Sequence, residues 1–189
     1  LCLVGSEMCI RDSYGSEDIK KSLLPKLVNG EIVGTMAVTE GLYAPTKNNI
    51  KLSCDDGILN GKKIAIPDAE AATHAIVVAK SNNGISLQVV DLLSEGVSIE
   101  HQENIDESRG HFSITFNNVK SDAIGDGTAG WEMYESIINQ AAVLFSYEQI
   151  GGSQATLDMA INYAKERYAF GRPIGCLLYT SPSPRDRVQ

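Results

Sequence analysis

The residues that could bind a metal or act as nucleophiles stand far apart in this 189-residue chain. His74, His101 and His111 have no cysteine or carboxylate partner at the spacing that metal ligands use. The cysteines form no paired motif either: Cys2, Cys9, Cys54 and Cys176. We therefore expect neither a metal site nor a disulfide framework, and surface or strand roles for the histidines.

The charge balance argues against a nucleic-acid partner. The chain has 16 Lys and Arg against 24 Asp and Glu, a formal net charge of -8, so no basic stripe offsets phosphate charge. Hydrophobic residues make up 43%, which is typical of a globular domain. No apolar run approaches the ~20 residues of a membrane span. These features predict a soluble, cytoplasmic protein.

Both ends of the chain differ from its middle. Residues 1–13 lack the basic region of a signal peptide, and residues 176–189 show no hydrophobic periodicity. Both segments resemble translated sequencing-adapter sequence. We expect them to be non-native, which leaves residues 14–175 as the informative part.

Three kinds of hydrophobic pattern follow one another along this middle part. Residues 18–28 have helical spacing, and Pro25 predicts that the helix is short or kinked there. The next part alternates short β-branched runs with turn residues, which predicts an antiparallel β-domain of two packed sheets. The runs are Ile32–Thr39, Ile50–Cys54, Ile58–Ile66, Ala75–Ala79, Ile85–Val90, Val97–His101 and Phe112–Phe116.

The period then changes to about 3.6 residues, from Trp131 to Tyr168. Gly151-Gly152 in the middle could separate two helices, because each glycine makes a helix less stable by about 1 kcal/mol than alanine would. We favour one long helix, because neither proline nor polar loop composition interrupts it. Its apolar face needs other helices, from the same chain or a second one. The fold class is therefore α+β: a helical tail (14–33), a β-domain (34–125) and a long helix that lacks its helical partners (126–175).

Several passages, in this order, resemble the acyl-CoA dehydrogenase family. They are KKSLLPKLVNGEIVGTMAVTE at 20–40, GILNGKKIAI at 57–66, NNGISLQVVDL at 82–92, FNNVKSDAIG at 116–125 and YAKERYAFGRPIG at 163–175. The ordered set covers nearly all of residues 14–175, roughly the middle of a full-length member. The DESRG passage at 106–110 is more similar to a divergent bacterial branch.

The resemblance implies a flavoenzyme assembled as dimers or tetramers, with FAD between the β-domain and a C-terminal helical bundle. In this family a glutamate removes the α-proton of an acyl-CoA thioester while flavin N5 accepts a hydride from the β-carbon. The electrons then pass to an electron-transfer flavoprotein.

The resemblance also implies residue roles. Val38 and Thr39 match the passage that meets the flavin pyrimidine edge. Arg167 matches the arginine that binds the FAD pyrophosphate of a partner subunit, and Phe170 matches the phenylalanine beside the adenine. Taken by themselves, these residues would be an ordinary strand-end threonine and a solvent-exposed arginine with a packing phenylalanine.

The sequence departs from the family pattern at two places. The family's Trp-Ile-Thr or Trp-Ile-Ser triplet over the flavin is Ala65-Ile66-Pro67 here, without the indole or the hydroxyl. We expect Ile66 and Pro67 to contact the flavin through backbone groups, unless the site is degenerate. In the loop after Thr39, Pro45 replaces the usual serine, and Thr46 is the expected substrate contact instead.

No catalytic base can be assigned. In most members of the family the base lies in late helices beyond these residues. Some members carry it where Ala141 stands here, and Glu148, about two turns away, is expected to be a helix-face charge. We therefore predict that these residues alone have no activity. Two other hypotheses remain: a non-catalytic partner subunit of a heteromeric dehydrogenase with a degenerate flavin site, and a β-sandwich binding module without a cofactor.

Overall fold

The computed structural model describes residues 15–105, 108–125 and 127–177. Most of the two terminal segments expected to be non-native lies outside these residues. The chain forms two compact units, one ending at Gln140 and the other beginning at Ala141. No helix within the described residues is long and apolar enough to cross a membrane.

The first described helix is α2 (Glu17–Val28). Ser16 caps it, because its Oγ accepts a hydrogen bond from the N–H of Ile19 at 3.3 Å. Pro25 does not end the helix, since α2 continues for three residues beyond it. Pro25 lies in the last turn, where only one backbone bond is lost, and its carbonyl still accepts the N–H of Asn29 at 3.0 Å.

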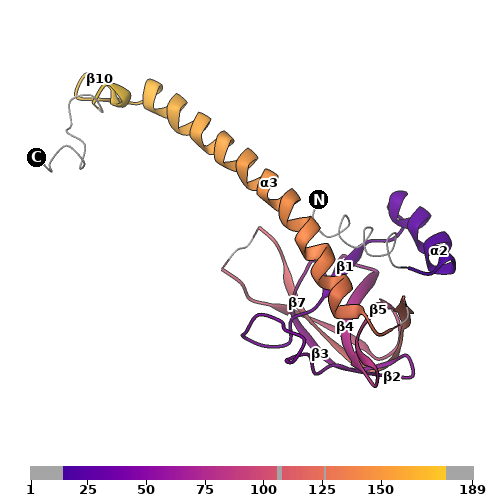
Figure 1. The fold of residues 1–189 in the computed structure, drawn as a ribbon. Helices are drawn as coiled ribbons and strands as arrows, with labels where there is room; N and C mark the ends of the chain where they lie inside the picture. Colours follow the sequence, from indigo (N-terminus) through magenta and orange to yellow (C-terminus); the bar gives the residue numbers. More distant parts are fainter. Residues whose placement is uncertain (1–14, 106–107, 126, 178–189) are drawn as a thin grey trace, which may run out of the picture. The chain divides into compact units, whose positions relative to one another are not determined.

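Eight strands form the β-domain, and Figure 1 shows their arrangement. Their hydrogen-bonded order is β6-β7-β3-β2-β4-β5-β8, with β1 pairing with β4. Seven match the predicted runs to within a few residues, and β8 is an additional short strand that pairs with β5. The bounds are β1 (Gly34–Ala37), β2 (Ser53–Asp55), β3 (Ile58–Pro67), β4 (His74–Ser81), β5 (Gly84–Asp91), β6 (Val97–Gln102), β7 (His111–Lys120) and β8 (Asp122–Ile124).

The α+β class is confirmed, and the pairing refines the antiparallel expectation. Most neighbours are antiparallel, but β4 pairs in parallel with both β1 and β2. These strands are far enough apart in sequence for a parallel crossover. Hydrogen bonding also joins all eight strands into one sheet rather than two separate ones.

Two hydrophobic cores lie on the two sides of β4, because successive strand residues point to opposite faces. Ala75, Val77 and Ala79 belong to one core, together with residues of β3 and β7. Ile76 and Val78 belong to the other, which includes the first turns of α3. The β-domain is therefore packed on both faces.

A charged side chain is buried with these apolar residues. Lys63 on β3 has an exposed fraction of 0%, and its Nζ donates to Glu40 Oε1 at 2.7 Å and to the Val38 carbonyl at 2.9 Å. Burial lowers the pKa of Lys63 to about 8, although the Glu40 carboxylate opposes this shift. The Glu40 carboxylate also accepts the N–H groups of Lys51 at 2.7 Å and Leu52 at 3.0 Å. The pair thus joins three segments of the β-domain.

The helix α3 (Gly130–Glu166) has 37 residues and runs through Gly151-Gly152, which confirms the prediction of one long helix. Its buried residues are Gly130, Met133 and Ile137. The hairpin of β9 (Tyr168–Ala169) and β10 (Arg172–Pro173) follows, and then the 3-10 helix η1 (Ile174–Leu177). Most apolar side chains of α3 beyond Gln140 are exposed in the single chain, including Leu144, Ile150, Leu157 and Met159.

The glycine pair of α3 provides a test of the uninterrupted helix. A Cβ at Gly151 or Gly152 would meet no heavy atom within 4 Å. Gly151→Ala and Gly152→Ala should therefore each stabilise the helix by about 1 kcal/mol, measured by urea unfolding followed by circular dichroism. Gly130→Ala is the matched control and should destabilise, because its Cβ would lie 2.6 Å from the Ile85 carbonyl oxygen. A loss of helicity in both alanine variants at 151 and 152 would contradict the continuous helix.

The buried lysine predicts an unusual dependence of stability on pH. The pKa of Lys63 falls from 10.5 to about 8 on folding, so between these values the unfolded chain holds a proton that the folded chain has lost. The free energy of unfolding should therefore rise with pH in this window. The free energy of unfolding of the parent chain, relative to that of Lys63→Met, should rise by about 2 kcal/mol between about pH 7 and about pH 10. Urea unfolding at each pH measures it. A constant difference would show that Lys63 keeps an ordinary pKa, and a falling one that folding raises its pKa.

Candidate functional site

The segment that leaves β1 holds Thr39, the predicted flavin contact. The Thr39 carbonyl accepts the N–H of Ile64 on β3 at 2.8 Å, and the preceding Val38 carbonyl accepts from Lys63. Thr39 is half-buried, and its hydroxyl has no hydrogen-bond partner among the described residues. The structure therefore fixes the backbone here and leaves the hydroxyl able to bind a ligand.

The loop at 41–49 is held by its own side chains. Asn49 accepts the N–H of Thr46 through Oδ1 at 2.7 Å and donates through Nδ2 to the Ala44 carbonyl at 2.9 Å. Lys47 forms an ion pair with Glu132 at 2.8 Å, and this hydrogen bond lowers the pKa of the Glu132 carboxyl group. The loop conformation is thus set by the chain itself.

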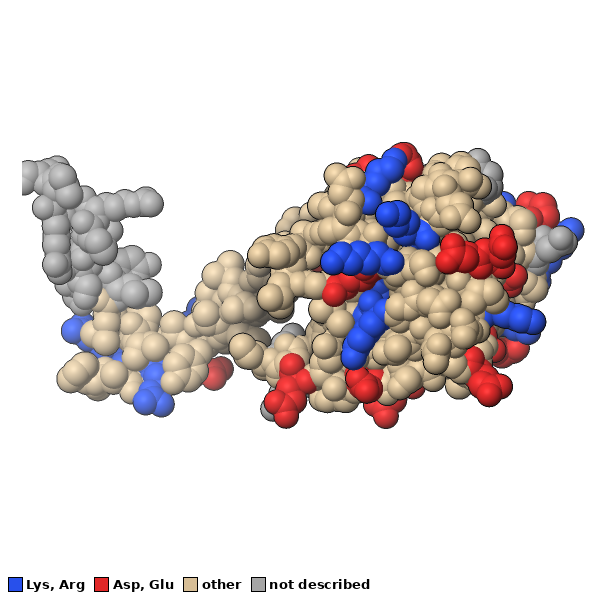
Figure 2. Space-filling view, turned by 90° about the horizontal axis from the view of Figure 1, so that it is seen from below, with Lys and Arg blue, Asp and Glu red and all other residues tan. Residues whose placement is uncertain are grey.

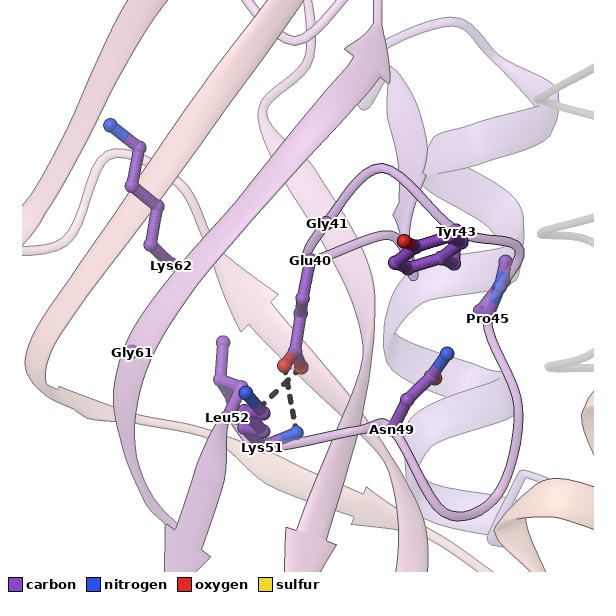
Figure 3. Close-up of a pocket in the computed structure, with 9 residues that line it drawn as sticks. All are labelled: Glu40, Gly41, Tyr43, Pro45, Asn49, Lys51, Leu52, Gly61 and Lys62. Carbon is purple, nitrogen blue, oxygen red and sulfur yellow. Dashed lines mark hydrogen bonds between the residues drawn. The ribbon is translucent and has the colours of Figure 1, made fainter.

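A cavity of about 370 Å³ lies between this loop and the middle of β3 (Figure 3). Tyr43 and Pro45 line it from the loop, and Lys51 and Lys62 line it from the β-domain. In Figure 3 the Glu40 carboxylate points across this region toward the backbone of Lys51 and Leu52. The cavity wall therefore includes one member of the buried ion pair.

Thr46, the predicted substrate contact, is not among the residues that line this cavity. It is exposed, and its N–H is already bonded to Asn49. Its hydroxyl has no hydrogen-bond partner among the described residues, so a substrate role for Thr46 stays a prediction.

Ile66 and Pro67, the other predicted contacts on the β-domain, use several of their groups within the fold. The Ile66 side chain is 1% exposed and belongs to a hydrophobic core. The Pro67 carbonyl accepts the hydroxyl of Thr35 at 2.8 Å. Pro67 has no N–H to donate, and its ring is half-buried, so a contact of these two residues with a cofactor stays a prediction.

Ala65 stands where the family has its tryptophan. It is exposed, has a positive φ of 53°, and donates its N–H to Gln102 Oε1 at 2.7 Å. A positive φ is uncommon for a residue with a side chain, so this backbone conformation is held by its surroundings. The bond between Ile64 and Thr39 places Ala65 next to the predicted flavin contact. The structure thus brings the two predicted cofactor segments of the β-domain together.

The second unit carries Arg167 and Phe170. The backbone of Arg167 bonds to Tyr163 and Ile174, both at 2.8 Å, while its guanidinium has no partner among the described residues. Phe170 and Gly171 form the two-residue turn between β9 and β10, with φ of 54° and 78°. Asn or Asp usually occupies the first position of such a turn, yet a phenylalanine stands here and is 93% exposed. Both side chains are therefore presented for contact.

The histidines have structural surroundings. The His101 ring lies edge-on to Phe112, with centroids 5.4 Å apart, and His111 Nδ1 lies 2.7 Å from Asn104 Nδ2. Within the described part of the chain, no three His, Cys, Asp or Glu side chains group as metal ligands. Glu148 lies on the exposed surface of α3, and no catalytic base can be assigned from its position.

The surface charges are mixed. On the face seen in Figure 2, basic side chains are interleaved with acidic ones over the β-domain. One contribution comes from the exposed ion pair between Lys62 and Glu100, at 3.1 Å.

Lys63 and Glu40 are the functional candidates that the sequence analysis missed. Both lie in passages quoted for the resemblance, VTE and GKKIAI, but a lysine in a strand is usually assigned to the exposed face. Alternation along β3 gave no clear signal, because Gly61 and Ala65 also lie an even number of residues from Lys63 and are exposed.

Comparison with known proteins gives consistent neighbours. No protein-family model matches the chain. The human mitochondrial short-chain specific acyl-CoA dehydrogenase is 27% identical over 177 residues, covering 85% of this chain and 42% of that protein. A glutaryl-CoA dehydrogenase solved with glutaryl-CoA superposes with a TM-score of 0.84 at 27% identity, covering 90% of this chain and 47% of the other. PigA, solved with FAD and proline, gives 0.83 at 27% identity, covering 93% and 50%.

The chain therefore spans about half the length of the relatives that it matches. Over that half, both the sequence and the fold agree with the resemblance drawn from the ordered motifs. Over this half, the curated and the structural neighbours consistently indicate the acyl-CoA dehydrogenase family.

Proposed function

We propose that this chain supplies the FAD-binding β-domain and the interface helix of an enzyme that dehydrogenates acyl-CoA thioesters between the α- and β-carbons. The observation that carries the proposal is Thr39, whose half-buried hydroxyl is left without a partner on a backbone fixed by β3. The family relationship gives this hydroxyl its ligand, the pyrimidine edge of a flavin.

The residues at both ends of the expected site fit FAD. Val38 and Thr39 offer a fixed backbone and a hydroxyl to the polar edge of the ring. On a second copy of the chain, the Arg167 guanidinium suits a diphosphate because it can donate two parallel hydrogen bonds. The exposed Phe170 can stack against an adenine. A dimer or tetramer of like subunits would bring these groups together.

When bound, FAD would supply the hydride acceptor for the reaction. The contribution of this chain is to bind and orient it. Hydrogen bonds to the thioester carbonyl would acidify the α-carbon, and the base that takes the proton is not among the residues assigned here. An electron-transfer flavoprotein is the proposed recipient of the electrons.

A second candidate function is a non-catalytic partner subunit of a heteromeric dehydrogenase. Ala65, Pro67 and Pro45 favour it, because they remove the aromatic cover and two hydroxyl groups that the family uses. Flavin absorbance separates the two functions: the enzyme should retain or rebind FAD, whereas the partner subunit should remain colourless when FAD is added.

The first test of FAD binding concerns Thr39. Thr39→Val keeps the side-chain shape and removes the hydroxyl, so the affinity for FAD should fall about fivefold, the worth of one hydrogen bond of about 1 kcal/mol. Titration of flavin fluorescence measures it. Thr115→Val is the matched control, a half-buried threonine on β7, and should leave the affinity unchanged. Equal effects of the two substitutions would remove Thr39 from the site.

The second test concerns the hairpin. Arg167→Met removes charge-assisted hydrogen bonds to the diphosphate, so FAD should bind at least about tenfold more weakly. Arg172→Met changes an exposed arginine of the same hairpin and should have little effect. With FMN, which lacks the adenosine diphosphate end, the parent chain and Arg167→Met should bind alike. A loss of FMN binding in Arg167→Met would indicate a general structural defect instead.

A further inference from the structure

Burial of the charged Lys63 side chain costs free energy. It is 0% exposed, and removing an ammonium group from water is unfavourable unless its hydrogen bonds are replaced. A methionine or leucine of similar volume would fill the same space without that cost. A lysine at this buried position therefore points to a requirement for the charge and its donors rather than for packing.

Both partners of this ammonium group belong to one segment, residues 38–40. Lys63 Nζ bonds to the Val38 carbonyl at 2.9 Å and to Glu40 Oε1 at 2.7 Å. Between them, the Thr39 carbonyl accepts the N–H of Ile64, the residue after Lys63. Three successive residues thus turn their acceptors toward β3. This arrangement fixes the position from which the Thr39 hydroxyl extends.

Glu40 carries the constraint to a second segment. Its carboxylate accepts the N–H groups of Lys51 and Leu52, which lead into β2, as the dashed lines in Figure 3 show. The loop at 41–49 therefore begins at one end of these hydrogen bonds and closes at the other. An apolar pair could not reproduce this link, because neither backbone N–H would have an acceptor.

We propose that the Lys63–Glu40 pair is the positioning device of the flavin site. It holds the Val38-Thr39 backbone in the conformation that binds the flavin edge and does not touch the flavin itself. The inference rests on the proposed binding of FAD at Thr39.

The experiment compares the parent chain with Lys63→Met, which preserves volume and removes the charge. FAD affinity is measured by flavin fluorescence in the absence of urea. Circular dichroism under the same conditions checks that each variant is folded. Lys63→Met should bind FAD about tenfold or more weakly, the loss expected for hydrogen bonds to a charged group. Lys63→Arg, which keeps the charge and N–H donors, should restore much of the affinity.

Val119→Ala is the matched control for stability. Val119 on β7 is 1% exposed and lies in the same hydrophobic core as Leu59. It pairs with Leu59 on β3, several residues away from Ile66 along that strand. It should lower the unfolding midpoint while changing FAD affinity by less than about twofold. Amide hydrogen exchange gives a readout without flavin: the N–H groups of Lys51 and Leu52 should exchange faster in Lys63→Met than in Val119→Ala.

The outcomes separate this inference from the proposed function. If the parent chain binds FAD and Thr39→Val weakens it, but Lys63→Met binds as tightly as the parent, the pair does not position the site. The same conclusion follows if affinity falls in proportion to stability in Lys63→Met and Val119→Ala alike. If the parent chain binds no FAD, the proposed function fails and the inference falls with it.

Discussion

A buried ammonium group must be surrounded by acceptors, and Lys63 meets that requirement with a single short segment of the chain. The carbonyl of Val38 and the carboxylate of Glu40 are held against β3, and Glu40 in turn holds the backbone that enters β2. The candidate site depends on this constraint, because Thr39 lies between the two anchored residues. Without these bonds, the half-buried segment that follows β1 would be free to fray.

This constraint explains how a flavin site could tolerate the departures from the family pattern. Ala65 and Pro67 remove the indole and the hydroxyl that cover the ring, yet the backbone around them remains ordered by other bonds. Ala65 keeps a positive φ with its N–H bound to Gln102. In the proposed site, the lost contacts would reduce the apolar area available to the flavin, whereas the polar edge would depend on Thr39 and keep its backbone geometry. Binding that relies on the edge should be weaker but still specific in orientation.

The sequence predicted local structure better than it predicted pairing. Alternation of apolar and polar residues located seven strands, and the absence of a breaker located the long helix through Gly151. The parallel partners of β4 could not be predicted, because pairing depends on which strands are adjacent after folding. Lys63 was missed for a related reason: its burial depends on Glu40, which lies 23 residues earlier. Periodicity detects apolar residues on a buried face, but a buried charge is recognised only with its partner.

The two ends of the proposed FAD site differ in what fixes them. Thr39 is held by bonds that one chain makes to itself, so its geometry should persist in an isolated subunit. Phe170 is different, because it occupies a left-handed turn position and exposes 93% of its surface. Both the positive φ and the exposure of an aromatic side chain to water are unfavourable. Under the proposed function, this residue would gain its stabilisation from the adenine and a neighbouring chain. The β-domain end is therefore organised before binding, and the hairpin end would contribute most of its free energy only when a second subunit and the adenine are both present.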